Sequence, residues 1–593
     1  MKNEVIVYCV AAYGEKISLC LTAMGYSVVA FCDHSEKLKG VLILGIPVYG
    51  YVQCREKFPD AVYVIANSNY GTALEIGEKL EKDGYQRNST YFISHELEYR
   101  GLLSNALYKN GVIKILSEKT VVLFGDSFLC SLFLQWAKAY LKNTKIEICP
   151  SEKEIDSYTE KYTAAVWIPL ELLIPEERNE GAMMCMFQEH GICSFSRFFM
   201  SYLPYCEQNH LFEKGSLVRR DTPDMGKESG VVIKKVLFLK TSSYSGSVFI
   251  NSVLSKHPQI LYLGYTDWGI HIWYIVNVAA GICREDLARE IIGWIRKYEG
   301  NVEWLGQYEK ILERYFMKKE CFSQKDIFVG IHLAYYELVH KVFPKEGELI
   351  IYMDIHYLML LGDCMFSWLE GMGFEIVLLE MIRKPYVRLG SIIRYALGEN
   401  HGKISNSQLL SFIAPFTGEE LETGEKKYPL IRLRFEDVKL YPEKILGKLC
   451  KLLEIEWSDM LLEPDGEESR YTINRESTVG FDLKPVYRTY DEYFDAFDKF
   501  RLDLIFREKN RAYGYSYVER EKYPLSLEEL GKLFELPFCF ERFISFRDED
   551  ERRRYHKKMR MLAEELLYFE EEKEKYAAHF QFGKYLGCEE ENS

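Results

Sequence analysis

The sequence has none of the spaced cysteine pairs that hold structural zinc. Its 15 cysteines are scattered, no Cys-x-x-Cys occurs, and the two closest are Cys185 and Cys193. Cysteines without such spacing are typical of free thiols in a reducing compartment. We therefore expect no metal centre.

Long apolar runs and an excess of positive charge are missing as well. The run 349–361 is interrupted by Asp354 and His356, and no uninterrupted apolar segment approaches the length of a membrane span. The first residues, Met-Lys-Asn-Glu-Val-Ile-Val-Tyr, follow a strand pattern instead of a secretory signal. The 75 basic against 89 acidic residues give a net charge of −14, which argues against a general binder of nucleic acid or anionic membranes. These absences predict a cytoplasmic protein with no nucleic-acid partner and no membrane span.

The stretch 236–258 is the most informative part of the chain. It begins with a short apolar run, 236–239, which predicts a buried parallel strand, and small hydroxyl residues follow around Gly246. Apolar residues then recur at helical spacing over 249–254. A strand, a hydroxyl-rich loop and a helix N-terminus form a cradle for anions, because loop amides and the helix dipole both favour negative charge. The Gly-Lys-Ser/Thr ending of an ATP-type loop is absent, and an ordinary strand-to-helix turn is the alternative.

The length of 593 residues predicts roughly three to four domains. Residues 207–230 are polar and broken by glycine and proline, which is typical of a linker. Past Tyr523 the chain becomes helical and highly charged. The predicted organisation is a Rossmann-like α/β domain over 1–115, a second small α/β region over 116–206, the linker 207–230, a parallel-sheet domain over 231–520 and a charged helical extension over 521–593.

The N-terminal part follows the layout of a dinucleotide-binding opening. A strand over 5–11 leads through Gly14 into a helix, and a second strand, 28–31, ends at Asp33, where a ribose ligand would lie. Gly14 stands alone where the fingerprint has three glycines. With its Gly-Ile-Pro-Val strand start and its Ala-Asn loop, this part resembles the small Rossmann-like domains of bacterial surface-polysaccharide enzymes. A structural or docking domain without a nucleotide is the favoured interpretation.

Residues 121–128 predict another strand, turn and helix, and further strands follow. The Gly-Asp-Ser triplet at 125–127 invites comparison with the nucleophile of GDS-type hydrolases. That chemistry needs an Asp-x-x-His pair to activate the serine, and the residue three before His190 is Phe187. A second α/β half is the favoured interpretation.

From residue 232 onward, strands alternate with helical patterns. The apolar runs 260–263, 349–353 and 374–379, and one that precedes Arg434, follow the opening strand. Such alternation predicts a parallel sheet, whose ligands gather at the carboxyl ends of the strands.

Three features follow one another along this domain: the Ser-Gly-Ser loop at 245–247 before His257-Pro258, the pair Arg383 and Ser391, and Arg434-Phe-Glu-Asp with the later Pro442-Glu443. In this order, residues 232 to about 520 resemble a sulfotransferase that uses 3′-phosphoadenosine 5′-phosphosulfate (PAPS), and the segment 510–515 looks like the family's closing residues. The resemblance implies PAPS as cofactor, with Arg383 and Ser391 on its 3′-phosphate. The implied cofactor-binding residues are Lys240, Thr241, Ser245, Gly246, Ser247, Arg383 and Ser391.

Arg383 suits a phosphate because a guanidinium donates two parallel hydrogen bonds, whereas a lysine acts only as a point charge. Ser391, eight residues further on, is expected at the start of a helix, from which it can donate its hydroxyl. A structural salt bridge is the alternative role for Arg383.

The sequence departs from the family at Tyr244. The family places a lysine or arginine immediately before the Ser/Thr-Gly of the loop, and the nearest cation here is Lys240, at the end of the strand. Sulfuryl transfer builds negative charge on the leaving 5′-phosphate oxygen, where a cation gives the largest expected stabilisation. Either Lys240 reaches across the loop as the catalytic cation, or it is a lysine in solvent and transfer is impaired.

The acceptor hydroxyl needs a general base within hydrogen-bond reach. The family takes it from a glutamate after the second strand or a histidine after the third, and Tyr265 stands at the glutamate position. His356 is therefore the first candidate base, Asp267 the second and His271 the third. A structural role for the histidine is the alternative.

In the C-terminal extension, an apolar seam at helical spacing comprises Tyr555, Met559, Leu562, Leu566 and Phe569. The seam predicts a helix that packs on the body of the protein or mediates self-association.

The predicted fold is α/β: a parallel-sheet, P-loop-like sulfotransferase domain, preceded by a Rossmann-like α/β region and followed by a helical extension. The leading hypothesis is an enzyme that moves a sulfuryl group from PAPS to a hydroxyl, on a glycan or glycolipid precursor or another small acceptor. Trp268, Trp273 and Tyr274 would stack on sugars or belong to the core. The runner-up is a non-catalytic sulfotransferase-like module, in which Tyr244 marks lost chemistry. A kinase is disfavoured because the phosphate-loop lysine is missing.

Overall fold

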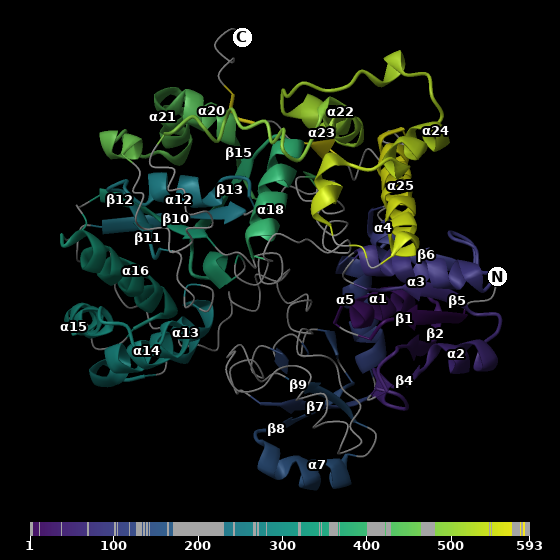
Figure 1. Ribbon diagram of the computed structural model, residues 1–593. Coiled ribbons are helices and arrows are strands. Elements are labelled where there is room, and N and C mark those ends of the chain that lie inside the picture. The colour runs from purple at the N-terminus through teal and green to yellow at the C-terminus, as the bar shows by residue number, and fades with distance from the viewer. Residues whose placement is uncertain are drawn as a thin grey trace. The chain divides into compact units, whose positions relative to one another are not determined.

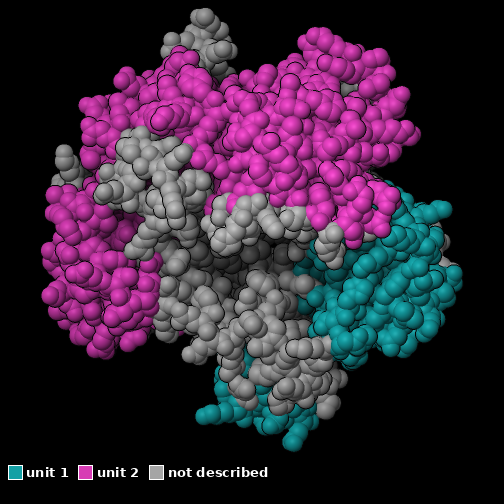
Figure 2. All heavy atoms as spheres, viewed as in Figure 1, with its two compact units in different colours: residues 1–214 teal, residues 215–593 magenta. Residues whose placement is uncertain are grey.

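The computed structural model describes residues 4–169 and 231–587 with gaps, of which the longest are 126–132, 170–230, 355–365, 400–420, 464–480 and 572–580. The chain forms two compact units, Met1–Lys214 and Gly215–Ser593, which Figure 2 colours separately. The expected linker, 207–230, lies outside the described residues.

The first unit contains a six-stranded sheet in the order β3-β4-β2-β1-β5-β6 (Figure 1). Its strands are β1 (Glu4–Tyr8), β2 (Ser27–Cys32), β3 (Leu42–Ile43), β4 (Ile46–Tyr49), β5 (Val62–Ile65) and β6 (Tyr91–Ile93). Its helices are α1 (Ala12–Ala23), α2 (Tyr51–Lys57), α3 (Tyr70–Lys82), α4 (Ser94–Tyr99) and α5 (Asn105–Leu116). Neighbouring strands are parallel except in the β3–β4 hairpin. The parallel strands, numbered along the chain, lie in the order 3-2-1-4-5, which confirms the Rossmann-like expectation.

A second, three-stranded sheet follows in the same unit, in the order β8-β7-β9. It consists of the parallel strands β7 (Thr120–Phe124), β8 (Lys145–Cys149) and β9 (Val166–Pro169), with η1 (Glu152–Glu154) and α7 (Ile155–Lys161) beside them. Trp167 and Phe124 are buried in its core. A second parallel sheet with its own core therefore follows the first in the chain, and residues 126 and 127 of the Gly-Asp-Ser triplet lie outside the described residues.

The second unit is built on a five-stranded sheet in the order β11-β12-β10-β13-β15. Its strands are β10 (Val231–Lys240), β11 (Ile260–Tyr262), β12 (Gly347–Asp354), β13 (Glu375–Ile382) and β15 (Leu430–Arg434). All neighbours are parallel, and the central strand β10 buries the whole apolar run 236–239. This confirms the predicted parallel-sheet α/β class.

Helices lie between these strands in the chain or follow the last of them. They are α12 (Ser247–Leu254), α13 (Ile272–Ala279), α14 (Arg284–Glu299), α15 (Leu305–Phe316), α16 (Gln324–His340), α18 (Pro385–Glu399), α20 (Phe435–Leu440) and α21 (Pro442–Leu453). Helices α13 to α16 form one inserted layer between β11 and β12 in sequence, and α16 packs against β11 (Figure 1).

The order of the strands fixes where a ligand would bind. From β10 the chain runs through α12 to β11, at one edge strand of the sheet. From β13, the neighbour of β10 in the opposite direction, it runs through α18 to β15, at the other edge strand. The connections therefore reverse direction between β10 and β13. In open α/β sheets, ligands bind outside the carboxyl ends of the strands at such a switch point.

The C-terminal extension is helical and packs on the rest of the unit. The segment before it contains η5 (Asp459–Leu462), α22 (Ala496–Ile505), α23 (Arg507–Ala512) and η6 (Arg520–Lys522). The extension itself contains α24 (Leu527–Lys532), η7 (Leu533–Glu535), η8 (Cys539–Phe543) and α25 (Glu549–Glu571). Helix α25 packs against α22, α24 and η7. Tyr555 and Met559 of the predicted seam are buried, which confirms a helix that packs on the body. The side chains of Leu562, Leu566 and Phe569 lie outside the description.

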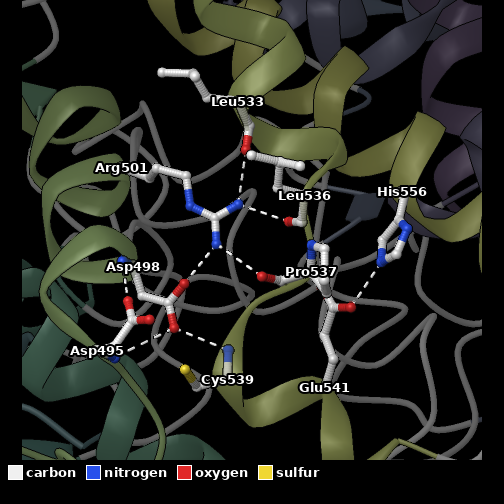
Figure 3. Close-up of polar contacts among 9 residues, drawn as sticks. All are labelled: Asp495, Asp498, Arg501, Leu533, Leu536, Pro537, Cys539, Glu541 and His556. Atoms are coloured by element: carbon white, nitrogen blue, oxygen red, sulfur yellow. Dashed lines mark hydrogen bonds and ion pairs between the residues drawn. The ribbon is translucent and has the colours of Figure 1, made fainter.

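A buried arginine joins this extension to α22. Arg501 is 0% exposed, forms an ion pair with Asp498 and donates to the carbonyl oxygens of Leu533 (2.7 Å), Leu536 (2.6 Å) and Pro537 (3.2 Å) (Figure 3). Three carbonyl acceptors and one carboxylate satisfy the two terminal nitrogens of this guanidinium, whereas its Nε has no partner among the described residues.

The end of the chain returns to the sheet, which the sequence pattern does not reveal. The strand β16 (Gln581–Phe582) pairs antiparallel with β14 (Leu421–Glu422). Further on, the Leu586 amide donates to the Arg432 carbonyl (2.8 Å) along the outer edge of β15. The expected extension is therefore helical only in part.

Among the described residues, no helix is long and apolar enough to cross a membrane.

Candidate functional site

The loop after β10 turns sharply because two of its residues take left-handed backbone conformations. Tyr244 has a φ of 66° and Gly246 a φ of 111°. A side chain at Gly246 would also collide with the Phe435 ring, since a Cβ there would lie 2.4 Å from a ring carbon. Glycine is therefore required at this position. The loop delivers the chain directly into α12, which begins at Ser247.

The N-terminus of α12 faces this loop with its backbone amides uncapped by a side chain. Gly246 is the N-cap and offers no side-chain oxygen, and no acidic residue lies in the first turn. The positive end of the helix dipole is therefore not neutralised by the helix's own residues, and it favours a negative group. Ser245 and Ser247 are buried here.

Arg383 follows β13 directly and lies on the other side of the switch point. Its guanidinium donates to the Tyr244 carbonyl (3.3 Å), the Pro485 carbonyl (3.0 Å) and the Ser391 hydroxyl (3.2 Å). It also lies over the Phe435 ring, 4.6 Å from the centroid. The predicted pair Arg383 and Ser391 is therefore brought together, beside the loop after β10.

The charge of Arg383 is buried without a carboxylate partner among the described residues. The side chain is 7% exposed, and its bonds go to carbonyl and hydroxyl oxygens only. Glu436, the acidic residue that acts on it electrostatically, instead accepts from the Tyr515 hydroxyl (2.8 Å). Burial accordingly lowers the pKa of Arg383. A salt bridge, the alternative role for this residue, is not found within the described part of the chain.

Ser391 lies in the interior of a helix, and the expectation of a helix start at this residue was wrong. Helix α18 begins at Pro385, because β13 runs on to Ile382 and proline suits the first helical position. Ser391 therefore faces Arg383 from the second turn of α18.

Lys240 ends β10 and is ion-paired across the sheet. Its ammonium lies 3.0 Å from the carboxylate of Glu380, which is fully buried and also accepts from Arg432 (2.7 Å). The strand register explains the contact, because Lys240 pairs with Glu380 on β13 and Glu380 with Arg432 on β15. The Lys240 charge is thus balanced by a carboxylate, in contrast to that of Arg383.

Lys439 is a second buried cation near the site, which sequence reasoning missed. It is 4% exposed, and its ammonium lies 3.9 Å from the centroid of the Phe249 ring on α12. Burial lowers its pKa to about 8, Asp482 opposes this effect, and the charge of Arg383 adds to it. The sequence signal that could have found Lys439 is its position shortly after the Arg434-Phe-Glu-Asp segment.

The remaining candidates fall into two groups. Tyr244 turns its ring to Tyr395 of α18, with centroids 5.5 Å apart, so its side chain does not replace the missing cation. Thr241 and the three candidate bases, His356, Asp267 and His271, lie outside the described residues.

One cluster of possible metal ligands lies elsewhere in the unit, formed by Asp495, Asp498 and Cys539. Asp498 already accepts from the backbone amides of Asp495 (3.3 Å) and Cys539 (2.8 Å) and pairs with Arg501 (Figure 3). Because Arg501 neutralises this carboxylate, we assign the cluster to helix capping.

Comparison with solved structures gives matches of low similarity, two of which are sulfotransferase domains. One is a sulfotransferase domain from the Synechococcus PCC 7002 olefin synthase, with 15% identity, a TM-score of 0.25, and coverage of 43% of this chain and 90% of that domain. The other is a sulfotransferase domain from the curacin biosynthetic pathway, with 16% identity, a TM-score of 0.22, and coverage of 40% and 79%. No protein-family model and no curated protein matches the chain. Because both TM-scores are low, the fold rests on its own strand order.

Proposed function

We propose that the second unit is a PAPS-dependent sulfotransferase that transfers a sulfuryl group to a hydroxyl of an acceptor. Arg383 carries the proposal: it is a buried cation at a switch point with no carboxylate partner among the described residues. A buried charge without a counter-ion is costly, and a bound anion removes that cost. Phosphate is the anion that a guanidinium, a serine hydroxyl and a helix N-terminus suit best.

The described residues divide between the two ends of such a nucleotide. Arg383 and Ser391 would bind the 3′-phosphate. The 5′ end would lie in the loop after β10, against Ser245, Gly246, Ser247 and Thr241. PAPS itself would supply the sulfuryl group. Lys240 would stabilise the charge on the leaving oxygen only after exchanging part of its contact with Glu380 for one with the ligand.

The acceptor and the base belong to the same proposal. We propose a glycan, glycolipid precursor or other small hydroxyl compound as acceptor, with His356 as the base and Asp267 as the second choice. We also propose that residues 231–520 suffice for nucleotide binding. A chain that begins near Ser229 should therefore bind adenosine 3′,5′-bisphosphate as tightly as the full chain does. Loss of binding in a folded shorter chain would place part of the site in the first unit.

A non-catalytic nucleotide-binding module is the second candidate, and one contact favours it. The loop has Tyr244 at the position of the family's cation, and the nearest cation, Lys240, is held by Glu380. Such a module would bind the nucleotide without transferring the sulfuryl group.

Calorimetric titration of the full chain tests the proposed function. Adenosine 3′,5′-bisphosphate should bind at least tenfold more tightly than adenosine 5′-monophosphate, because only the former carries the 3′-phosphate that Arg383 would recognise. Equal affinities, or no binding of either compound, would reject a PAPS site. Transfer of ³⁵S from labelled PAPS to hydroxyl acceptors then separates the enzyme from the non-catalytic module.

A further inference from the structure

Tyr490 lies against the proposed phosphate site, and no sequence motif marks it. Its hydroxyl oxygen is 2.6 Å from Ser391 Oγ, and its side chain is 3% exposed. Tyr490 thus extends the pair of Arg383 and Ser391 to a row of three polar groups.

Hydrogen-bond capacity assigns the direction of this contact. Ser391 Oγ accepts from Arg383 Nη1 (3.2 Å) and lies 3.1 Å from the Val387 carbonyl, to which it donates its one proton. A hydroxyl has one proton and two acceptor positions. Tyr490 must therefore donate its proton to Ser391 Oγ, so the tyrosine holds the serine in place.

The backbone holds Tyr490 in an unusual conformation to achieve this. Its φ is 52°, in the left-handed region that a bulky residue rarely adopts. Its carbonyl accepts from the amides of Tyr493 (2.9 Å) and Phe494 (3.0 Å), and its ring stacks on that of Tyr493. A strained conformation that the surroundings fix this firmly is typical of functional positions.

Gly390 provides the space for the Tyr490 ring. A Cβ at Gly390 would lie 2.5 Å from the nearest ring carbon, and two more ring carbons would lie within 2.9 Å. The fit of ring and glycine therefore sets the distance between the tyrosine hydroxyl and Ser391.

We propose that Tyr490 is a specificity-determining residue that, with Arg383 and Ser391, selects nucleotides phosphorylated on the 3′ oxygen of the ribose, and that Gly390 admits its ring. The inference rests on the proposed function and adds a residue that acts on the phosphate through Ser391. Because Ser391 Oγ accepts from Tyr490 and Arg383, the serine can turn its one proton from the Val387 carbonyl to a phosphate oxygen, and the Arg383 guanidinium favours a dianionic phosphate over a free ribose hydroxyl.

The test compares adenosine 3′,5′-bisphosphate with adenosine 5′-phosphosulfate, which has no 3′-phosphate, in titrations of the full chain. Tyr490→Phe keeps the ring and removes only the hydroxyl, so affinity for the bisphosphate should fall by about three- to tenfold. Affinity for the phosphosulfate and the melting temperature should stay unchanged. Tyr493→Phe, in the stacked neighbour, is the matched control and should alter neither affinity.

Gly390→Ala provides a second route to the same result. The added methyl group displaces the Tyr490 ring and should weaken the bisphosphate selectively, by at least as much as Tyr490→Phe does. Gly447→Ala is its control, because Gly447 also lies in a helix and a Cβ there meets nothing within 4 Å.

The outcomes separate this inference from the proposed function. If Arg383→Ala weakens the bisphosphate selectively and Tyr490→Phe does not, Tyr490 is not a determinant and the inference is wrong. If Tyr490→Phe weakens both nucleotides equally, its role is to support the helix. If the unaltered chain binds no bisphosphate, the proposed function and the inference both fail.

Discussion

Two buried arginines in the second unit have opposite surroundings. Arg501, on α22, pairs with Asp498 and donates to three carbonyl groups (Figure 3). Arg383, at the carboxyl edge of the sheet, donates to two carbonyls and a hydroxyl and has no carboxylate partner among the described residues.

The difference teaches how to tell a structural arginine from one that recognises a ligand. A buried guanidinium that the fold already neutralises stabilises the fold, and removing it leaves a carboxylate buried and unpaired. A guanidinium that the fold leaves positive has charge available for an incoming anion. Arg501 and Arg383 should therefore differ in what their loss affects: stability in the first case and nucleotide affinity in the second.

Replacement of Arg501 should give the largest effect. Arg501→Met removes the partner of Asp498 and the donor to three carbonyls, so the free energy of unfolding should fall by about 3–5 kcal/mol in urea denaturation. Arg553→Met, which breaks the exposed pair with Asp550, is the control and should change the free energy of unfolding far less, because solvent screens an exposed pair. Equal losses in the two variants would show that the Arg501 network does not stabilise the extension.

Replacement of Arg383 should lower affinity more than stability. Arg383→Ala should weaken adenosine 3′,5′-bisphosphate by roughly tenfold to several hundredfold, and Ser391→Ala by less than about tenfold, because charge-assisted bonds are stronger than neutral ones. The loss of stability in Arg383→Ala should be smaller than that in Arg501→Met. The reverse ranking of stabilities would make Arg383 the structural arginine.

His332 extends the comparison to a buried group that has neither a counter-ion nor a ligand. Burial lowers its pKa to about 4, Nδ1 lies 2.8 Å from the Phe328 carbonyl, and Nε2 has no partner among the described residues. Because the folded pKa lies below the usual 6.5, the unfolded chain takes up the proton first. His332 therefore contributes full stability above about pH 6.5, and this contribution is lost as the pH falls toward 4.

Between pH 7 and pH 5 the stability should fall by about 2 kcal/mol from this residue alone. His332→Leu should remove that part of the pH dependence, which denaturation at the two pH values measures. An unchanged slope would mean that the imidazole is solvated in the folded protein.

The smallest effect is expected in the first unit, at Asp33, the predicted ribose ligand. Its carboxylate accepts from the backbone amides of Val10 (3.0 Å), after β1, and Ser35 (2.8 Å), after β2, so it holds these two loops together. Asp33→Ala should destabilise the chain by about 1–2 kcal/mol and leave bisphosphate affinity unchanged. A drop in that affinity would show that the first unit, and not the second, binds the nucleotide.

Local patterns in the sequence predict much of this fold. The apolar run 236–239 marks the central strand, and the glycine at 246 marks the turn into α12, because burial and backbone conformation leave local traces. The first half of β10 was not recognised, since it alternates between buried and exposed residues from Val231 onward.

Contacts between distant strands could not be predicted in this way. Glu380 reaches Lys240 only through the register of β13 on β10, and the left-handed backbone of Tyr490 has no signature in its neighbours. The tail at Leu586 joins β15 by pairing with a segment more than a hundred residues away, which no local pattern records. The loop after β10 and the position of Arg383 were thus foreseeable, whereas the residues that contact them were not.

The most direct test of the account is the discrimination between two nucleotides by the full chain and its Arg383→Ala variant. In calorimetric titration, the variant should lose affinity for adenosine 3′,5′-bisphosphate by roughly tenfold to several hundredfold, while its affinity for adenosine 5′-phosphosulfate barely changes, because only the former has a phosphate for the guanidinium to recognise. Equal losses for the two nucleotides would contradict the account and make Arg383 a second Arg501.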